Sequence, residues 1–108
     1  MKTKSITMNI DIQSLHFKAD ETLKAFVLKK TEKLSRLDER ILAADICLKT
    51  ERSETTDNKI CEIRLSLAGQ ALFASRKSKT FEQATSEAVE ALKRQLRKRK
   101  TQMSKGRN

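Results

Sequence analysis

The 108-residue sequence has no proline, only two glycines, and no apolar run near the roughly 20 residues that a membrane-crossing helix needs. Its start, MKTKSITMN, also lacks the apolar core of a secretory signal. So little proline and glycine argues against a collagenous repeat or a linker and favours regular secondary structure. We therefore expect one soluble, cytoplasmic domain over residues 1–101 and a short basic, flexible tail over residues 102–108.

Residue types that carry chemistry are equally scarce. The two cysteines, Cys47 and Cys61, do not form a CxxC pair and have no histidine beside them, so two reduced thiols are favoured over a zinc site, although spacing alone leaves a disulfide open. The single histidine, His16, falls in an expected surface connection, where such residues are usually inert. With no nucleophile beside a base and no phosphate-cradling glycine loop, we predict a binding protein rather than an enzyme, with no cofactor, metal or small-molecule substrate.

Aromatic side chains are limited to four phenylalanines, with no tyrosine or tryptophan. Periodicity assigns Phe26 and Phe81 to the core, which leaves no stacking platform of the kind that single-strand readers use. Phe73 alternates onto a face that we expect to be open, where it can stack a base or be covered by the tail or by a partner. Recognition of a nucleic acid is therefore expected to depend on phosphates and shape, as on structured RNA.

Four segments alternate apolar and polar residues in the manner of half-buried strands: residues 5–12, 41–50, 59–67 and 70–76. One face of each predicted strand is apolar and the other polar. The sheet that they form should therefore be covered on one side and wetted on the other.

Two further segments, residues 21–36 and 81–101, repeat apolar residues at helical spacings, and Asp20 and Thr80 are placed to cap them. The order β-α-β-β-β-α predicts an α+β fold, a four-stranded sheet with two helices on one face. A right-handed crossover should join the first two strands, and a meander should follow.

Positive charge is the one feature in excess, with a formal net charge of +10. Residues 1–75 hold 13 Lys or Arg against 11 Asp or Glu, whereas residues 76–108 hold 11 against 3. Leu92 and Leu96 keep helical spacing through a run in which six of the eight residues from Lys93 to Lys100 are basic. Such asymmetry indicates a polyanionic partner.

A basic helix end also interacts well with the helix dipole, and exposed helix faces are commonly charged. That explanation accounts for two or three cations and not for six of eight, so a nucleic-acid partner is favoured. The lysines of residues 21–36 are interleaved with glutamates and fit an ordinary solvated face. The candidate RNA-binding residues all lie in the last third of the chain: Arg76, Lys77, Lys79, Lys93, Arg94, Arg97, Lys98 and Lys100.

The element order, the turn LAGQALFAS and the helix ATSEAVEALKRQLRKRK resemble the ribosome hibernation promoting factor and ribosome-associated translation inhibitor family, also called sigma-54 modulation proteins. Members end this helix with a similar Lys/Leu/Gln/Leu/Lys pattern, here residues 92–98. The resemblance implies a domain similar to a double-stranded RNA-binding domain. Such a domain binds the small ribosomal subunit and its rRNA in the mRNA and tRNA channel and silences idle ribosomes in stress or stationary phase.

The resemblance also implies that the eight cations above contact rRNA, and that the protein is a monomer off the ribosome with no membrane partner. Because the chain ends at Asn108, it looks like a short form, and whether it promotes ribosome dimers stays open. Many relatives carry an Asp and a Tyr where this chain has Thr80 and Glu82, so contacts of those side chains are not carried over. The alternatives are an RNA- or DNA-binding module without ribosome preference, a regulator of an acidic protein and, last, an enzyme.

Overall fold

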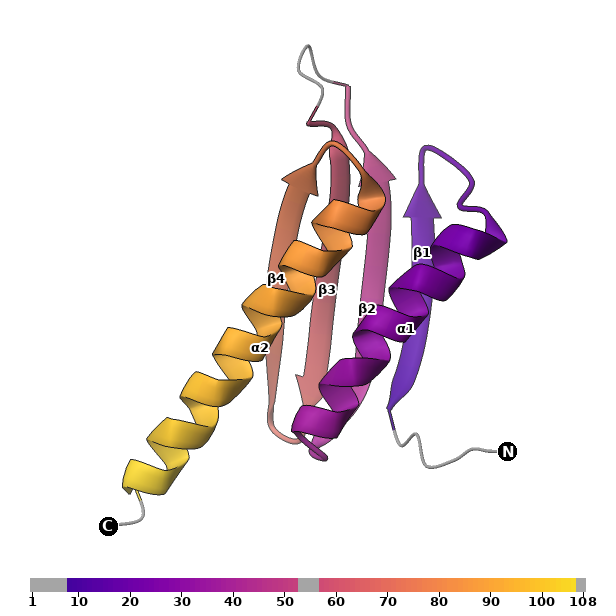
Figure 1. The fold of residues 1–108 in the computed structure, drawn as a ribbon. Coiled ribbons are helices and arrows are strands. Elements are labelled where there is room, and N and C mark those ends of the chain that lie inside the picture. The colour runs from indigo at the N-terminus through magenta and orange to yellow at the C-terminus, as the bar shows by residue number, and fades with distance from the viewer. Residues whose placement is uncertain (1–7, 53–56, 107–108) are drawn as a thin grey trace.

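The computed structural model describes residues 8–52 and 57–106, with side chains as far as residue 99. The predicted α+β class and the order of six elements are confirmed (Figure 1). Their bounds are β1 (Asn9–Leu15), α1 (Glu21–Leu37), β2 (Ile41–Thr50), β3 (Lys59–Leu67), β4 (Gln70–Ser78) and α2 (Phe81–Gly106).

Several ends of helices and strands differ from the sequence prediction. Strand β1 begins at Asn9 and continues to Leu15, because it pairs in parallel with β2 as far as Lys49, while residues 5–7 lie outside the described residues. Strand β4 continues past residue 76 to Ser78. Helix α2 does not end near residue 101 but reaches Gly106, since no glycine or proline interrupts it earlier. The flexibility expected of residues 102–108 stays a prediction.

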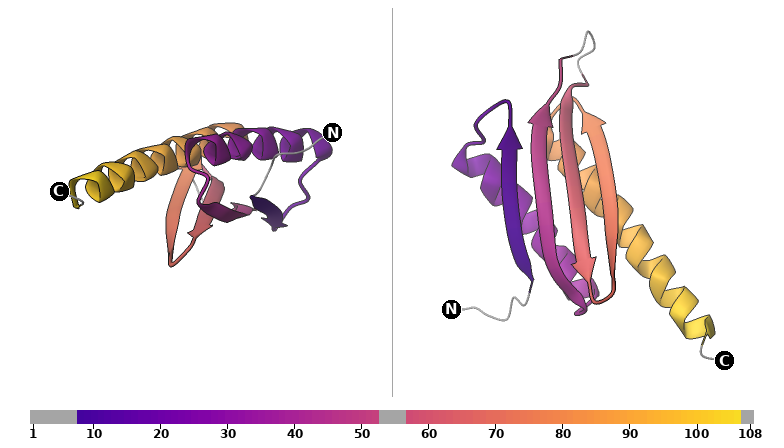
Figure 2. Two further views of the ribbon diagram at one scale, coloured as in Figure 1. Left: turned by 90° about the horizontal axis from the view of Figure 1, so that it is seen from below. Right: turned by 180° about the vertical axis from the view of Figure 1, so that it is seen from behind.

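The sheet has the strand order β1-β2-β3-β4, with β1 parallel to β2 and the other neighbours antiparallel. Helix α1 makes the crossover, and β2 to β4 form the predicted meander. Both helices cover one face, and the other face is open (Figure 2). Gly69, at φ 84°, closes the β3–β4 turn. The side-chain amide of Gln95 on α2 donates a hydrogen bond of 3.0 Å to the backbone carbonyl of Phe73 on the edge strand β4.

The core lies between the sheet and the two helices. The apolar stripe predicted for α2, from Phe81 through Ala84 and Ala88 to Leu92 and Leu96, is buried along its whole length. It packs with fully buried strand residues into one hydrophobic cluster. Full burial of a leucine side chain stabilises a fold by roughly 1.5–3 kcal/mol, so the leucines fix how α2 is rotated.

The predicted helix caps are both present. Asp20 Oδ1 accepts a 2.8 Å hydrogen bond from the backbone N–H of Leu23, and Thr80 Oγ1 accepts a 3.0 Å bond from that of Gln83. Each bond satisfies a donor that the first helical turn leaves without a partner. Within residues 8–52 and 57–106, neither helix contains a stretch long and apolar enough to cross a bilayer.

The two cysteines are free thiols on opposite faces of the sheet. Cys47 is half-buried on the open face of β2, and Cys61 is buried in the core on β3. The disulfide that spacing alone left open is therefore not formed. Desolvation raises the pKa of Cys61 to about 11, so this thiol stays protonated at neutral pH.

Candidate nucleic-acid interface

The second half of α2 presents basic side chains on the sides that the core does not use. Arg94, Arg97 and Lys98 are exposed, and none of them forms an ion pair within the described side chains. Together with Lys93 they are called the α2 band below. The C-terminal part of α2 extends past the end of the sheet in both Figure 1 and Figure 2, so that ligands can approach it from several sides.

One carboxylate lies at the start of the α2 band. Glu90 Oε2 is 3.0 Å from Lys93 Nζ, three residues further along the helix. Hydrogen bonding from Lys93 lowers the pKa of Glu90, and the charge of Lys93 acts in the same direction. The charges of Arg97 and Arg94 lower this pKa further. Glu90 therefore stays ionised at neutral pH and offsets part of the charge of the band, while the three other cations keep theirs free.

Arg76, one of the predicted residues, joins the α2 band through a groove. Its position on β4 is opposite Cys61 in the strand register, which turns its side chain toward the helices. A groove of about 260 Å³ between β4 and α2 is lined by Arg76, Glu87, Glu90 and Arg94. One arginine from β4 and one from α2 therefore line the groove, together with two carboxylates of α2.

Lys77 does not join this group, because alternation along β4 turns it onto the open face of the sheet. There it forms an ion pair with Glu51 at the end of β2. Lys79 is exposed in the short connection before α2, and Lys100 lies in α2 with its side chain outside the described residues. The structure thus brings Arg76 together with the α2 band and separates Lys77 from it.

Sequence reasoning missed a hollow of about 1000 Å³ at one end of the open face, to which Lys77 contributes. A second ion pair, between Lys49 Nζ and Glu62 Oε2 at 3.2 Å, lies in the same hollow. The charged residues at alternate positions of β2, β3 and β4 were the available signal. Among the described residues, no group of three or more His, Cys, Asp or Glu side chains could hold a metal ion.

One protein family and several solved structures match this chain. Residues 10–104 match the family described as "Sigma 54 modulation protein / S30EA ribosomal protein". A ribosomal subunit interface protein from Coxiella burnetii superposes with a TM-score of 0.76 at 19% identity, over 87% of this chain and 99% of that chain. The N-terminal domain of Protein Y from Thermus thermophilus superposes with a TM-score of 0.73 at 22% identity, over 84% and 98%. No curated protein matches the sequence.

Proposed function

The chain belongs to the sigma 54 modulation protein / S30EA ribosomal protein family, and from this membership we propose that it binds the small ribosomal subunit and keeps idle ribosomes from translating. The family predicted from the sequence is thus confirmed. The likeness to solved structures at this low identity supports the fold. We infer the ribosome as partner from the family and from the charge of the chain. A ribosome-bound protein is in turn expected in the cytoplasm.

The observation that carries the proposal is the α2 band. Its cations lie on a helix whose rotation is fixed by buried Leu92 and Leu96, so they are held on a defined side of the domain. Arg94, Arg97 and Lys98 form no ion pair within the described side chains and are ready to contact phosphates. Phosphate contacts of this kind position a protein on folded RNA without reading its bases.

We propose that inhibition is by occupancy of the channel in which mRNA and tRNA meet on the small subunit. Such a mechanism requires shape and charge, and no covalent bond has to form or break. The domain is an elongated body with Cα extents of 51 × 35 × 19 Å. If six to ten phosphates are contacted, the affinity should fall by roughly 10³ to 10⁵ between 50 and 200 mM salt.

Sedimentation with purified small subunits tests the proposal. The wild-type chain should sediment with the subunits at 50 mM salt, also in the presence of excess duplex RNA, and should be released at about 200 mM. A triple variant, Arg94→Glu, Arg97→Glu and Lys98→Glu, should stay in the supernatant. These positions are exposed, so the variant should keep the circular dichroism of the wild type.

The matched control carries the same change of charge elsewhere: Lys18→Glu, Lys29→Glu and Lys33→Glu, which are exposed positions before and on α1. This control should retain most of the binding. The proposal is wrong if the wild type does not sediment with small subunits at low salt, or if the α2 triple variant sediments as well as the control. If the α2 triple variant loses affinity for duplex RNA and for subunits equally, the result would indicate an RNA-binding module without ribosome preference.

A further inference from the structure

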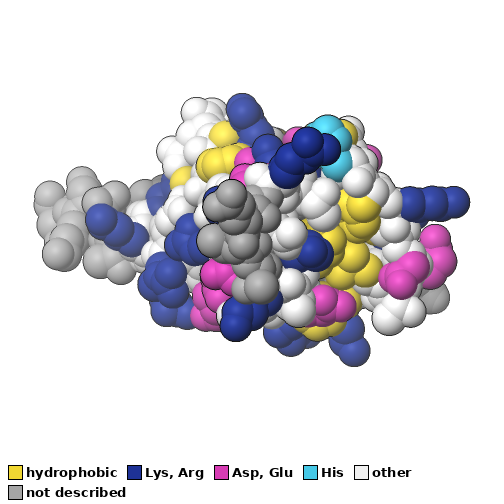
Figure 3. Space-filling model, turned by 90° about the horizontal axis from the view of Figure 1, so that it is seen from above, with side chains coloured by type: hydrophobic (Ala, Val, Ile, Leu, Met, Phe, Trp, Pro, Cys, Tyr) yellow, Lys and Arg dark blue, Asp and Glu magenta, His cyan; other side chains and the backbone are white. Residues whose placement is uncertain are grey.

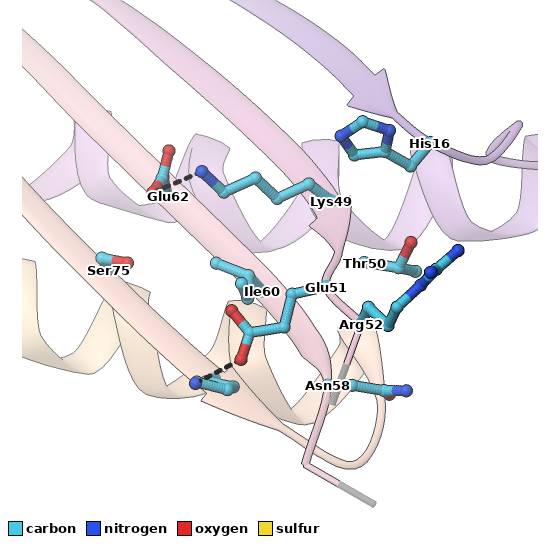
Figure 4. A pocket seen from close by; sticks show the side chains of 10 residues that line it. His16, Lys49, Thr50, Glu51, Arg52, Asn58, Ile60, Glu62 and Ser75 are labelled. Carbon is cyan, nitrogen blue, oxygen red and sulfur yellow. Dashed lines mark hydrogen bonds and ion pairs between the residues drawn. The ribbon is translucent and has the colours of Figure 1, made fainter. Parts of the chain in front are cut away.

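The hollow on the open face has walls from four parts of the chain. It lies where β2 and β4 end, where β3 begins and where the chain leaves β1 (Figure 4). Figure 4 shows its side chains on the near side of the strands, with both helices behind them. The hollow is therefore on the face of the sheet opposite to the α2 band, and one flat ligand cannot contact both sites.

Cations are the main charged groups of the hollow that can accept a new partner. Lys49 and Lys77 each pair with a glutamate, but these four side chains keep between 29% and 48% of their surface exposed. Exposed ion pairs contribute little, so an incoming anion can replace Glu51 beside Lys77 at small cost. The half-buried pair of Lys49 and Glu62 costs more to open. Arg52 is exposed and forms no ion pair with the described residues.

The uncharged side chains of the hollow can contact the sugar and the base of a nucleotide. Thr50 and Ser75 supply hydroxyl groups and Asn58 an amide, all able to donate hydrogen bonds to phosphate or sugar oxygens. Ile60 is buried, with 8% of its surface exposed, and forms part of the floor, whereas His16 is exposed and contributes a ring. A basic groove with an aromatic ring on which one base can stack is the usual arrangement of a single-strand contact, and His16 supplies the one ring among the described residues that line this hollow.

His16 has an unusual backbone conformation. Its φ is 70°, the one positive φ among the described residues other than glycine. A left-handed conformation costs a non-glycine residue roughly 1–2 kcal/mol, so the connection after β1 is held in an unfavourable conformation. Figure 3 shows the imidazole at the surface, with Lys and Arg side chains beside it in this view.

We propose that this hollow binds the backbone of single-stranded RNA, with Lys49, Arg52 and Lys77 along its phosphates and a base against His16. The proposal rests on the proposed function, because a domain lodged in an RNA-lined channel has RNA on more than one side. The hollow would then be a second RNA contact, independent of the α2 band. Glu51 and Glu62 remain beside the phosphates, so the added affinity is modest.

The experiment uses the full chain carrying the α2 triple variant, in which the first site is removed. A single-stranded uridine hexanucleotide is titrated against it, and amide resonances are followed by NMR. The resonances of His16, Thr50, Ile60 and Ser75 should shift, whereas those of the second half of α2 should not. Inorganic phosphate and a glutamate hexapeptide are titrated in parallel, and both should bind more weakly than the RNA.

A second pair of variants in the same background identifies the groups involved. Replacing Lys49 and Arg52 with glutamine should weaken hexanucleotide binding about fivefold, because exposed ion pairs are individually weak. The control replaces Lys29 and Lys33 of α1 with glutamine, the same change in charge, and should bind as the parent does. Both pairs should retain the parental circular dichroism.

The proposal is overturned if the resonances of the hollow do not move, if both glutamine pairs lose binding equally, or if phosphate or the peptide binds as well as RNA. These results are independent of the test of the proposed function. If the hollow does not bind RNA, the wild type should still sediment with small subunits, and the α2 triple variant should still fail to do so. Failure of ribosome binding would appear in the wild-type sedimentation whatever the hexanucleotide does.

Discussion

Replacing Glu90 with glutamine is expected to tighten binding to ribosomal RNA, although it removes an ion pair. Glu90 holds Lys93 at 3.0 Å and lies beside Arg94 in the groove that Arg76 also lines. A phosphate that approaches this end of the α2 band meets the repulsion of the carboxylate and must compete for Lys93. The lowered pKa keeps Glu90 ionised at the neutral pH of a binding assay, so the full charge is removed by the substitution.

The magnitude follows from the number of phosphates contacted. Releasing Lys93 adds at most one contact, which steepens the dependence of log affinity on log salt concentration by about 0.9. Between 200 and 50 mM salt, this change corresponds to a gain of about three- to fourfold. We therefore expect Glu90→Gln to bind about threefold tighter than the wild type at 50 mM salt, and the two proteins to converge near 200 mM.

The matched control is Glu21→Gln on α1. Glu21 also pairs with a lysine three residues further on, with 3.6 Å between Lys24 Nζ and Glu21 Oε2, and its removal changes the net charge equally. Affinities for small subunits would be measured by filter binding at four salt concentrations. An unchanged or weaker affinity of Glu90→Gln would contradict the reasoning. An equal gain in Glu21→Gln would show that net charge, and not the groups around Lys93, sets the affinity.

Three further predictions concern the scaffold. Leu92→Ala removes a fully buried side chain and should lower the free energy of unfolding in urea by about 2–5 kcal/mol; a loss below about 1 kcal/mol would contradict its role in docking α2. Thr80→Ala should cost about 1 kcal/mol in the same assay and Thr80→Asp much less, because only the alanine removes the cap. Burial raises the pKa of Cys61 above its ordinary value of 9.0 to about 11, because the thiolate is disfavoured in the core. The neutral thiol therefore contributes fully to the free energy of unfolding below pH 9, and this contribution is lost as the pH rises toward 11. Thermal melts should show this loss, up to roughly 3 kcal/mol, in the wild type and not in Cys61→Ala.

Local signals allowed the elements to be predicted from the sequence. Helix α1 begins where Asp20 places a carboxylate within reach of the first turn, and its observed end differs by one residue from the expected one. The buried stripe of α2 follows from spacing alone. Buried Thr31 and Thr85 were not predicted, since periodicity counts threonine as polar. In the structure, Thr31 Oγ1 donates a 2.8 Å hydrogen bond to the carbonyl of Val27, which makes its burial tolerable.

Only those parts of the site whose residues are close together in the sequence could be predicted. The α2 band is one run of sequence, and periodicity places its cations outside the core. Lys77 is different, because its partner Glu51 lies 26 residues earlier in the chain, and only the pairing of β2 with β3 and of β3 with β4 brings them together. The hollow depends on the same long-range register and on the conformation of His16, neither of which a single sequence reveals.

The amide of Gln95 has a consequence for crowding on and off the ribosome. A border strand with unsatisfied carbonyls is a template onto which another chain can add. By donating to the Phe73 carbonyl, Gln95 removes one docking point from the outer margin of β4. The same helix that carries the cations thus also discourages stacking of copies through this border.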